Sequence, residues 1–179
     1  MTQAQVIFVD VQHDFTTKGF FYDQRGHGIT AIQRALHNIE LLTKEIKSEI
    51  PIALTISEYR ANQFGKGISM CIPKTRGQEP SIDTANVMHE FVKNEHSALT
   101  CQPLLDYLQN NKIKRIIVAG FLTEYCIKAT ILDAIKLGFE TYYIAECIAT
   151  GDDKTAKHQE CIELFNTYGA KPLKLSELL

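Results

Sequence analysis

The stretch that decides the fold is residues 113–134, IKRIIVAGFLTEYCIKATILDA, in which a short apolar run leads directly into a helical pattern. Residues 116–119 are apolar and mostly β-branched, which predicts a buried strand. We expect Gly120 to end this strand, Thr123 to cap the helix that follows, and Glu124 to add negative charge to its first turn. The pair predicts one strand–helix unit of an α/β protein.

Cys126 falls at the start of the predicted helix, just past the carboxyl end of the predicted strand. Open α/β sheets place their ligand crevices at this end of the strands. A helix N-terminus also lowers the pKa of a thiol, and the thiolate is the reactive form. Cys126 is therefore either a catalytic nucleophile or, as is common for a cysteine in an amphipathic helix, a small buried apolar residue.

Length and charge limit the classes of protein that this chain can belong to. Its 179 residues suffice for a single domain, residues 1–179, with a sizeable core, and its net charge of −2 provides no basic field for nucleic acid. The apolar runs are too short to span a bilayer, and the opening segment MTQAQVIFVD has no charged n-region or cleavage site. We expect a soluble, cytoplasmic protein without a membrane or nucleic-acid partner.

The five cysteines are scattered along the chain and show no C-x-x-C spacing. An odd number without such spacing favours free thiols over a disulfide framework or a zinc site.

Apolar strand patterns alternate with amphipathic helix patterns along the whole chain. Further strands are predicted at residues 5–9, 51–56, 90–93, 139–145 and 172–175, and further helices at 30–47, 104–108 and 155–165. This alternation predicts an α/β fold with a parallel sheet covered by helices on both faces.

Three predicted strands end in residues that can take part in catalysis: Asp10, Lys93 and Cys126. The carboxyl ends of parallel strands meet at one edge of a sheet, so these side chains are expected to face the same crevice. A cation would stabilise the thiolate, and a carboxylate could take and return its proton. The alternatives are a turn or cap role for Asp10 and a solvated, exposed Lys93.

Two polar, glycine-containing segments are predicted to lie near this edge. Residues 16–28 read as a loop that borders the site. Residues 58–80 form a long irregular segment, which is either functional or a solvated excursion. Its hydrogen-bond donors are Arg60, Asn62, Gln63, Lys74 and Arg76.

Three motifs in this order and spacing resemble the isochorismatase-like cysteine hydrolases, the superfamily that includes nicotinamidases and N-carbamoylsarcosine amidohydrolases. Residues 9–15, VDVQHDF, are similar to the family's D-x-Q-x-D-F opening. Lys93 lies within VKN, and residues 120–127, GFLTEYCI, resemble the family's G-x-x-T-[DE]-x-C-[VI] run. Thr130 and Ala134 also match the following helix, so the resemblance covers nearly the whole chain.

The resemblance implies a six-stranded parallel sheet in a three-layer α/β/α sandwich and a catalytic triad of Asp10, Lys93 and Cys126. It also implies a cis peptide bond between Phe121 and Leu122, which would aim the Leu122 N–H beside the Cys126 N–H as an oxyanion hole. The family usually forms homo-oligomers, so the same is expected here. Phe15 and Tyr125 are expected to shape the substrate pocket.

The chain departs from the nicotinamidases of this family at their metal site. Those enzymes bind a metal through an Asp-x-His pair and a second His just after the second strand. Residues 55–64, TISEYRANQF, contain neither Asp nor His, and Ser57 and Arg60 cannot replace such ligands. We therefore expect no metal and no other cofactor.

These observations favour a metal-independent cysteine hydrolase that cleaves a C–N bond of a small amide or ureido compound through a thioester. In this hypothesis Asp10 also activates the water that hydrolyses the thioester. Two alternatives remain open: an isochorismatase-type vinyl-ether hydrolase, a group that typically lacks the nucleophilic cysteine, and a non-catalytic protein that keeps the fold and a reactive thiol. A nucleotide-binding domain is disfavoured, because no G-x-G-x-x-G or Walker loop follows the first strand.

Overall fold

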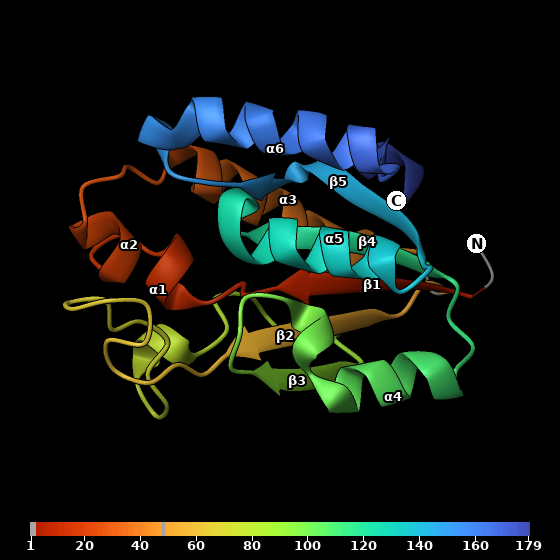
Figure 1. Cartoon of the computed structure of the whole chain (residues 1–179), viewed down its shortest axis with the longest axis horizontal. Coiled ribbons are helices and arrows are strands. Elements are labelled where there is room, and N and C mark those ends of the chain that lie inside the picture. Colours follow the sequence, from red (N-terminus) through yellow and green to blue (C-terminus); the bar gives the residue numbers. More distant parts are fainter. Residues whose placement is uncertain (1–2, 48) are drawn as a thin grey trace.

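The computed structural model describes residues 3–47 and 49–179 and contains one six-stranded parallel sheet, in the order β3-β2-β1-β4-β5-β6 (Figure 1). The strands are β1 (Ala4–Val9), β2 (Ile52–Ser57), β3 (His89–Lys93), β4 (Arg115–Phe121), β5 (Glu140–Ala149) and β6 (Lys171–Leu173). The α-helices are α1 (His13–Thr16), α2 (Phe21–Gln24), α3 (Thr30–Glu45), α4 (Gln102–Asn110), α5 (Lys128–Lys136) and α6 (Thr155–Tyr168). Short helical turns span Arg76–Gln78, Ala98–Thr100, Thr123–Ile127, Asp152–Lys154 and Leu175–Glu177.

The sheet separates two hydrophobic cores, because alternate residues of a strand point to opposite faces. On one face, Val6 and Phe8 of β1 pack in the core that contains Ile39 and Leu42 of α3. On the other face, Ile7 and Val9 belong to a core completed by the apolar sides of α4, α5 and α6. In Figure 1, α4 and α5 lie in front of the sheet and α3 lies behind it. The predicted three-layer α/β/α sandwich is confirmed.

Glycine at position 120 allows β4 to lie against β1 at the edge where the candidate residues meet. A Cβ on Gly120 would lie 2.0 Å from the Val9 carbonyl oxygen, and its φ of +125° is one that L side chains rarely adopt. The sequence had predicted that Gly120 ends this strand, and this prediction is wrong. β4 continues to Phe121, and Gly120 pairs with Val9. Without a side chain at position 120, the backbones of β4 and β1 can approach closely and remain paired at Val9.

The predicted cap at the start of the helix is wrong. The N-cap position is Leu122, and Thr123 instead lies inside a π-helical turn, Thr123–Ile127, that leads into α5. Its hydroxyl lies 2.9 Å from His158 Nδ1 of α6. A partner from a distant helix has replaced the local capping bond. Glu124 lies in the first turn as expected, and Cys126 lies within the π turn.

Several element boundaries also differ from the sequence prediction. The loop expected over residues 16–28 contains α2, and α1 begins at His13, although no helix was expected after β1. The strand predicted at 139–145 runs on to Ala149, and its pairing with β4 shifts register between Val118 and Gly120. The other strands differ from their predicted limits by no more than two residues at each end.

All five cysteines are free, as predicted, and all five are buried. No helix in the described part of the chain has the length and apolar composition needed to cross a membrane. Met1 and Thr2, which belong to the segment examined for a signal sequence, lie outside the described residues.

Candidate active site

Asp10 occupies the first position after β1, in a backbone conformation that turns the chain sharply. Its φ is +55°, and its carbonyl oxygen accepts a hydrogen bond from the Gln12 N–H at 2.9 Å, two residues along, as in a γ-turn. The Asp10 N–H donates to the Thr55 carbonyl oxygen of β2 at 2.9 Å. The side chain is completely buried, and Oδ1 has no hydrogen-bond partner among residues 3–47 and 49–179.

Lys93 ends β3 in register with Ser57 of β2 and is buried, not exposed. Its ammonium group lies 2.8 Å from Asp10 Oδ2, and it donates to Ser57 Oγ at 2.8 Å and to the Glu95 carbonyl oxygen at 2.9 Å. These three contacts match the three N–H donors of a lysine. The three N–H groups of the ammonium therefore each have an oxygen acceptor, in addition to the nearby sulfur of Cys126.

The Cys126 thiol lies at the centre of a ring of polar groups. Its sulfur is 3.6 Å from Lys93 Nζ, 3.7 Å from the Tyr59 hydroxyl and 3.7 Å from His96 Nδ1. The Tyr59 hydroxyl is also 3.2 Å from Lys93 Nζ. The structure therefore brings Asp10, Lys93 and Cys126 together, and it adds two groups that the sequence analysis did not select.

The direction of the Cys126 pKa shift is opposite to the sequence expectation. Burial and the nearby Asp10 carboxylate raise the pKa of the thiol to about 12, although Lys93 lowers it. A helix start was expected to lower this pKa, but desolvation of a side chain that is 3% exposed outweighs it. Burial lowers the pKa of Lys93, but Asp10 and Cys126 outweigh burial and raise it overall. Burial and Asp10 thus favour the protonated form of the thiol, beside the buried contact between Lys93 and Asp10.

The segment between β4 and the π turn lies directly before Cys126. The peptide bond between Phe121 and Leu122 is cis. The Leu122 carbonyl oxygen accepts from Tyr125 N–H at 3.1 Å and Ile127 N–H at 3.3 Å, whereas the Leu122 N–H has no acceptor within the described chain.

The D-x-Q-x-D motif has a physical explanation in the loop contacts around the site. Gln12 is buried, and its amide accepts from the Ser57 N–H at 2.8 Å and donates to the Ser57 carbonyl oxygen at 3.0 Å. Asp14 accepts from the Cys71 N–H at 2.6 Å, and a Cβ on Gly77 would lie 2.3 Å from the Asp14 carboxyl group. The two side chains attach the end of β2 and the 58–80 segment to the turn after β1.

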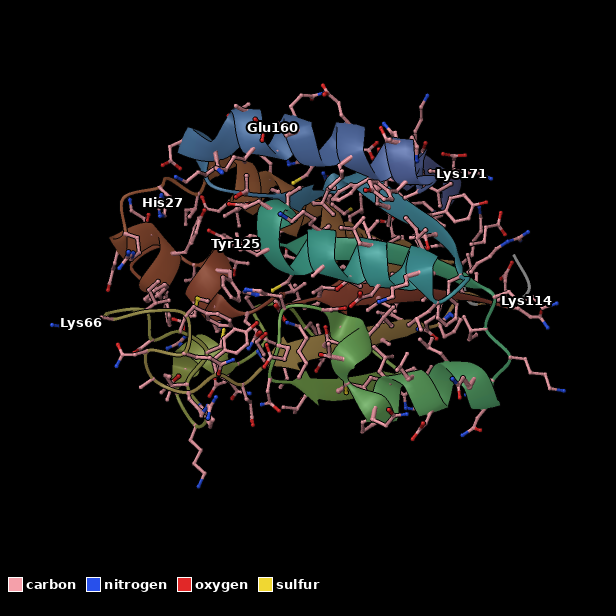
Figure 2. All side chains as sticks on the ribbon, viewed as in Figure 1. His27, Lys66, Lys114, Tyr125, Glu160 and Lys171 are labelled. Carbon is pink, nitrogen blue, oxygen red and sulfur yellow. The ribbon has the colours of Figure 1, made fainter. Side chains whose placement is uncertain are left out.

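A cavity of about 210 Å³ reaches Cys126. Its lining residues are mostly apolar or aromatic: Phe15, Phe21, Tyr22, Arg25, His27, Phe64, Ile68, Met70, His96, Leu122, Tyr125 and Cys126. Figure 2 shows His27 and Tyr125 toward the end of the molecule that carries α1, α2 and the 58–80 segment, with Lys114 and Lys171 at the opposite end. Phe15 and Tyr125, which the sequence analysis expected to shape a substrate pocket, both line this cavity.

The 58–80 segment contributes apolar side chains to the cavity instead of its predicted donors. Phe64, Ile68 and Met70 line it, and none of the donors named from the sequence does. The Gln63 amide accepts from the Arg60 N–H at 3.0 Å and donates to the Asn94 carbonyl oxygen at 2.7 Å. The Gln63 side chain thus links the segment to the residue that follows β3.

The residues at the end of β2 and just beyond it do not fit a divalent metal ion. Ser57 Oγ and the Tyr59 hydroxyl, which occupy this region, both face the Lys93 ammonium group, at 2.8 and 3.2 Å. A second cation at the same oxygens would be repelled by that charge. The described residues also contain no cluster of three His, Cys, Asp or Glu side chains suited to a metal.

Ser57, Tyr59 and His96 were missed by the sequence analysis. Ser57 could have been found, because it ends β2 and the strand-end rule that selected Lys93 applies equally to it. His96 lies three residues after Lys93 and Tyr59 two residues beyond β2, and no local pattern marks either of them as a neighbour of the thiol. Their contacts with Cys126 span 30 and 67 residues of sequence.

A family model described as "Isochorismatase domain" matches residues 4–177. A nicotinamidase of Escherichia coli (strain K12) is 30% identical over 71 residues, which make up 40% of this chain and 31% of that protein. A probable inactive nicotinamidase of Arabidopsis thaliana is 24% identical over 169 residues, and the match covers 84% of each chain. The chain thus spans less than a third of the E. coli protein but most of the A. thaliana one.

Solved structures of low sequence identity share the fold. The pyrazinamidase of Pyrococcus horikoshii, in complex with zinc, has a TM-score of 0.76 and 23% identity, covering 96% of this chain and 99% of that chain. PnC1 from L. infantum, in complex with nicotinate, has a TM-score of 0.83 and 18% identity, covering 99% of this chain and 96% of that chain. Both agree with the observed parallel α/β architecture.

Proposed function

The chain belongs to the isochorismatase family, and on that premise we propose that it is a metal-independent cysteine hydrolase that cleaves a C–N bond of a small amide or ureido compound. The observation that carries this proposal is the cluster of Asp10, Lys93 and Cys126, of which Cys126 lines the cavity. Lys93 Nζ lies 2.8 Å from Asp10 Oδ2 and 3.6 Å from Cys126 Sγ. A nucleophile, a base and a cation in mutual contact next to a cavity are the parts that acyl transfer requires.

In the proposed acylation step, the S–C bond forms as the thiol proton moves to Asp10. The transfer has to accompany attack, because a thiol with a pKa of about 12 is not ionised at neutral pH. Lys93 Nζ, 3.6 Å from Sγ, stabilises the negative charge on sulfur during attack. The carbonyl oxygen, now negative, accepts hydrogen bonds from the N–H groups of Leu122 and Cys126.

The C–N bond breaks when the tetrahedral intermediate collapses, and Asp10 passes the proton to the leaving amine. The product of this half-reaction is a thioester on Cys126, which water then hydrolyses. The free N–H of Leu122 supports the oxyanion-hole assignment, since a donor without an internal acceptor is available to the substrate.

The cavity supports a small substrate with an apolar or planar body. Aromatic side chains, including Phe15 and Tyr125, form much of its wall, and the volume of about 210 Å³ suits a compound of modest size. Nicotinamide belongs among the candidates because curated relatives are nicotinamidases.

A hydrolysis screen over primary amides including nicotinamide, carbamoyl compounds and isochorismate tests the proposal. The expected result is release of ammonia or amine by the wild type, none by Cys126→Ala, and an acyl adduct on Cys126 by intact-mass detection. Turnover of isochorismate that survives Cys126→Ala would instead establish the vinyl-ether hydrolase.

A non-catalytic protein is the second candidate, because one relative is described as a probable inactive nicotinamidase. Absence of both turnover and adduct across the screen, in a folded protein, would favour it.

A further inference from the structure

Asp10 and His96 are the two possible bases near Cys126, and they differ in their access to the cavity. Asp10 is completely buried and does not line the cavity. His96 is partly exposed, lines the cavity, and places Nδ1 3.7 Å from Cys126 Sγ. A group that enters from solvent therefore meets the imidazole before it can reach the carboxylate.

Aromatic neighbours fix the His96 ring. Its plane is stacked on Phe64, with centroids 4.5 Å apart and an interplanar angle of 15°. The Tyr125 ring lies at 5.6 Å, tilted by 34°. Stacking favours this plane of the ring, and in the observed orientation Nδ1 faces the sulfur.

The surroundings keep His96 in the neutral form that can accept a proton. Burial lowers its pKa below the ordinary value of 6.5, and the Lys93 ammonium lowers it further. Asp10 and Glu95 act in the opposite direction, and Lys128 lowers the pKa again. The thiol of Cys126 faces the same ring nitrogen and is protonated at rest.

We propose that His96 is the general base that activates water for hydrolysis of the thioester on Cys126. This assignment rests on the proposed function and replaces Asp10 in that step alone. After acylation the acyl group occupies the cavity side of Sγ, and it separates Asp10 from water that enters there. A water within hydrogen-bond reach of Nδ1 can lie roughly 3 Å from the acyl carbon attached to Sγ.

The step balances without any further reactant. The water oxygen bonds to the thioester carbon as one water proton moves to His96 Nδ1. The tetrahedral intermediate then expels the sulfur, which takes that proton from the imidazolium. The acid product leaves, and both the thiol and the neutral imidazole are restored. A thiol with a pKa of about 12 recovers the proton readily from an imidazolium ion.

Burst kinetics with p-nitrophenyl acetate test the assignment without a known substrate. This ester acylates Cys126 with release of p-nitrophenolate, and the slower steady rate reports hydrolysis of the acetyl-enzyme. We expect His96→Asn to keep the burst within a few-fold and to slow the steady phase by about 10²-fold or more. The acetyl adduct should accumulate on Cys126 by intact mass, and added imidazole should restore hydrolysis in His96→Ala.

The pH profile separates a base from a wall residue. In the wild type, hydrolysis of the adduct should stay constant near pH 7 and fall only below pH 6.5, where the imidazole becomes protonated. That fall should disappear in His96→Asn. Phe64→Leu, which removes the stacking partner but keeps the imidazole, should retain it. His37→Asn, an exposed change on α3, controls for the substitution itself.

The possible failures are distinguishable. No burst and no adduct on Cys126 in the wild type would overturn the proposed function and this inference together. An adduct that the wild type and His96→Asn hydrolyse at the same rate would overturn the role of His96 alone. Equal slowing of burst and steady phases, or the same profile loss in Phe64→Leu, would show that the ring only shapes the wall.

Discussion

Lys93 Nζ lies 2.8 Å from Asp10 Oδ2, and both side chains are completely shielded from solvent. The two residues end strands that are separated in the sheet by β2. A buried charge without a partner is costly, so each member of this pair stabilises the other. The pair also leaves Oδ1 of Asp10 without a partner in the described chain, and this oxygen is available for a proton.

Lys93→Met is expected to lower the free energy of unfolding by about 3–5 kcal/mol, because the Asp10 carboxylate loses its buried cation. Urea denaturation measures the change, with the exposed Lys66→Met as the matched control. The double variant Asp10→Asn/Lys93→Met should be less destabilised than the sum of the single variants. Additive losses would mean that the pair is not coupled.

The alkylation rate of Cys126 should increase with pH well beyond the range of an ordinary thiol. Burial and Asp10 raise its pKa to about 12, so at pH 7 it should hold far less thiolate than a free cysteine of pKa about 8.5. Iodoacetamide modification gives the rate at each pH. Peptide mapping is needed to assign the label to Cys126, because the other four cysteines are also free thiols. A plateau reached near pH 7 would show that the thiolate is already formed at rest.

Removal of divalent metals should leave activity unchanged, because Ser57 and Tyr59 face the Lys93 ammonium and leave no suitable ligand set. The measurement is turnover before and after dialysis against EDTA. Loss of turnover that zinc, iron or manganese restores would contradict this expectation.

Asp10→Asn and Cys126→Ser should fail at different points of the reaction. Asn cannot accept the thiol proton, so acylation should slow by about 10²–10⁴-fold. Ser is a poor nucleophile at neutral pH, so no acyl-enzyme should accumulate. The double variant should be little worse than either single variant, because residues that act as one unit are non-additive. Single-turnover kinetics measure the acylation rate of each variant. Losses that multiply in the double variant would show that Asp10 and Cys126 do not act as one unit. Urea denaturation of each variant controls for the loss of the Asp10 charge beside Lys93.

Gly120→Ala should destabilise the protein by at least about 2 kcal/mol, because its Cβ would meet the Val9 carbonyl oxygen at 2.0 Å and its φ is +125°. Gly138→Ala is the matched control. Its φ is +85°, but no atom lies within 4 Å of the added Cβ, so it reports backbone strain alone. Equal losses in thermal unfolding would mean that the contact with β1 is not limiting.

Much of the fold was predictable because local patterns carry it. The apolar runs of β1, β2 and β4 are nearly continuous, as buried parallel strands require, and they alternate with helical periodicity. The boundaries that failed depend on contacts between distant residues. Thr123 lies inside the π turn, where its hydroxyl pairs with His158 of α6, and the end of β5 pairs with Gly120 and Phe121 of β4.

The sequence by itself determined which residues follow β1, end β3 and start the helical segment after β4, and hence that Asp10, Lys93 and Cys126 lie at the carboxyl ends of the strands. Only the tertiary structure decided their state. Packing buries Lys93, which is usually an exposed residue type, and burial reverses the expected pKa shift of Cys126. It also brings Tyr59 and His96 to the thiol across 67 and 30 residues of sequence. Periodicity records which face of an element is apolar, whereas desolvation and proximity depend on the elements packed around it.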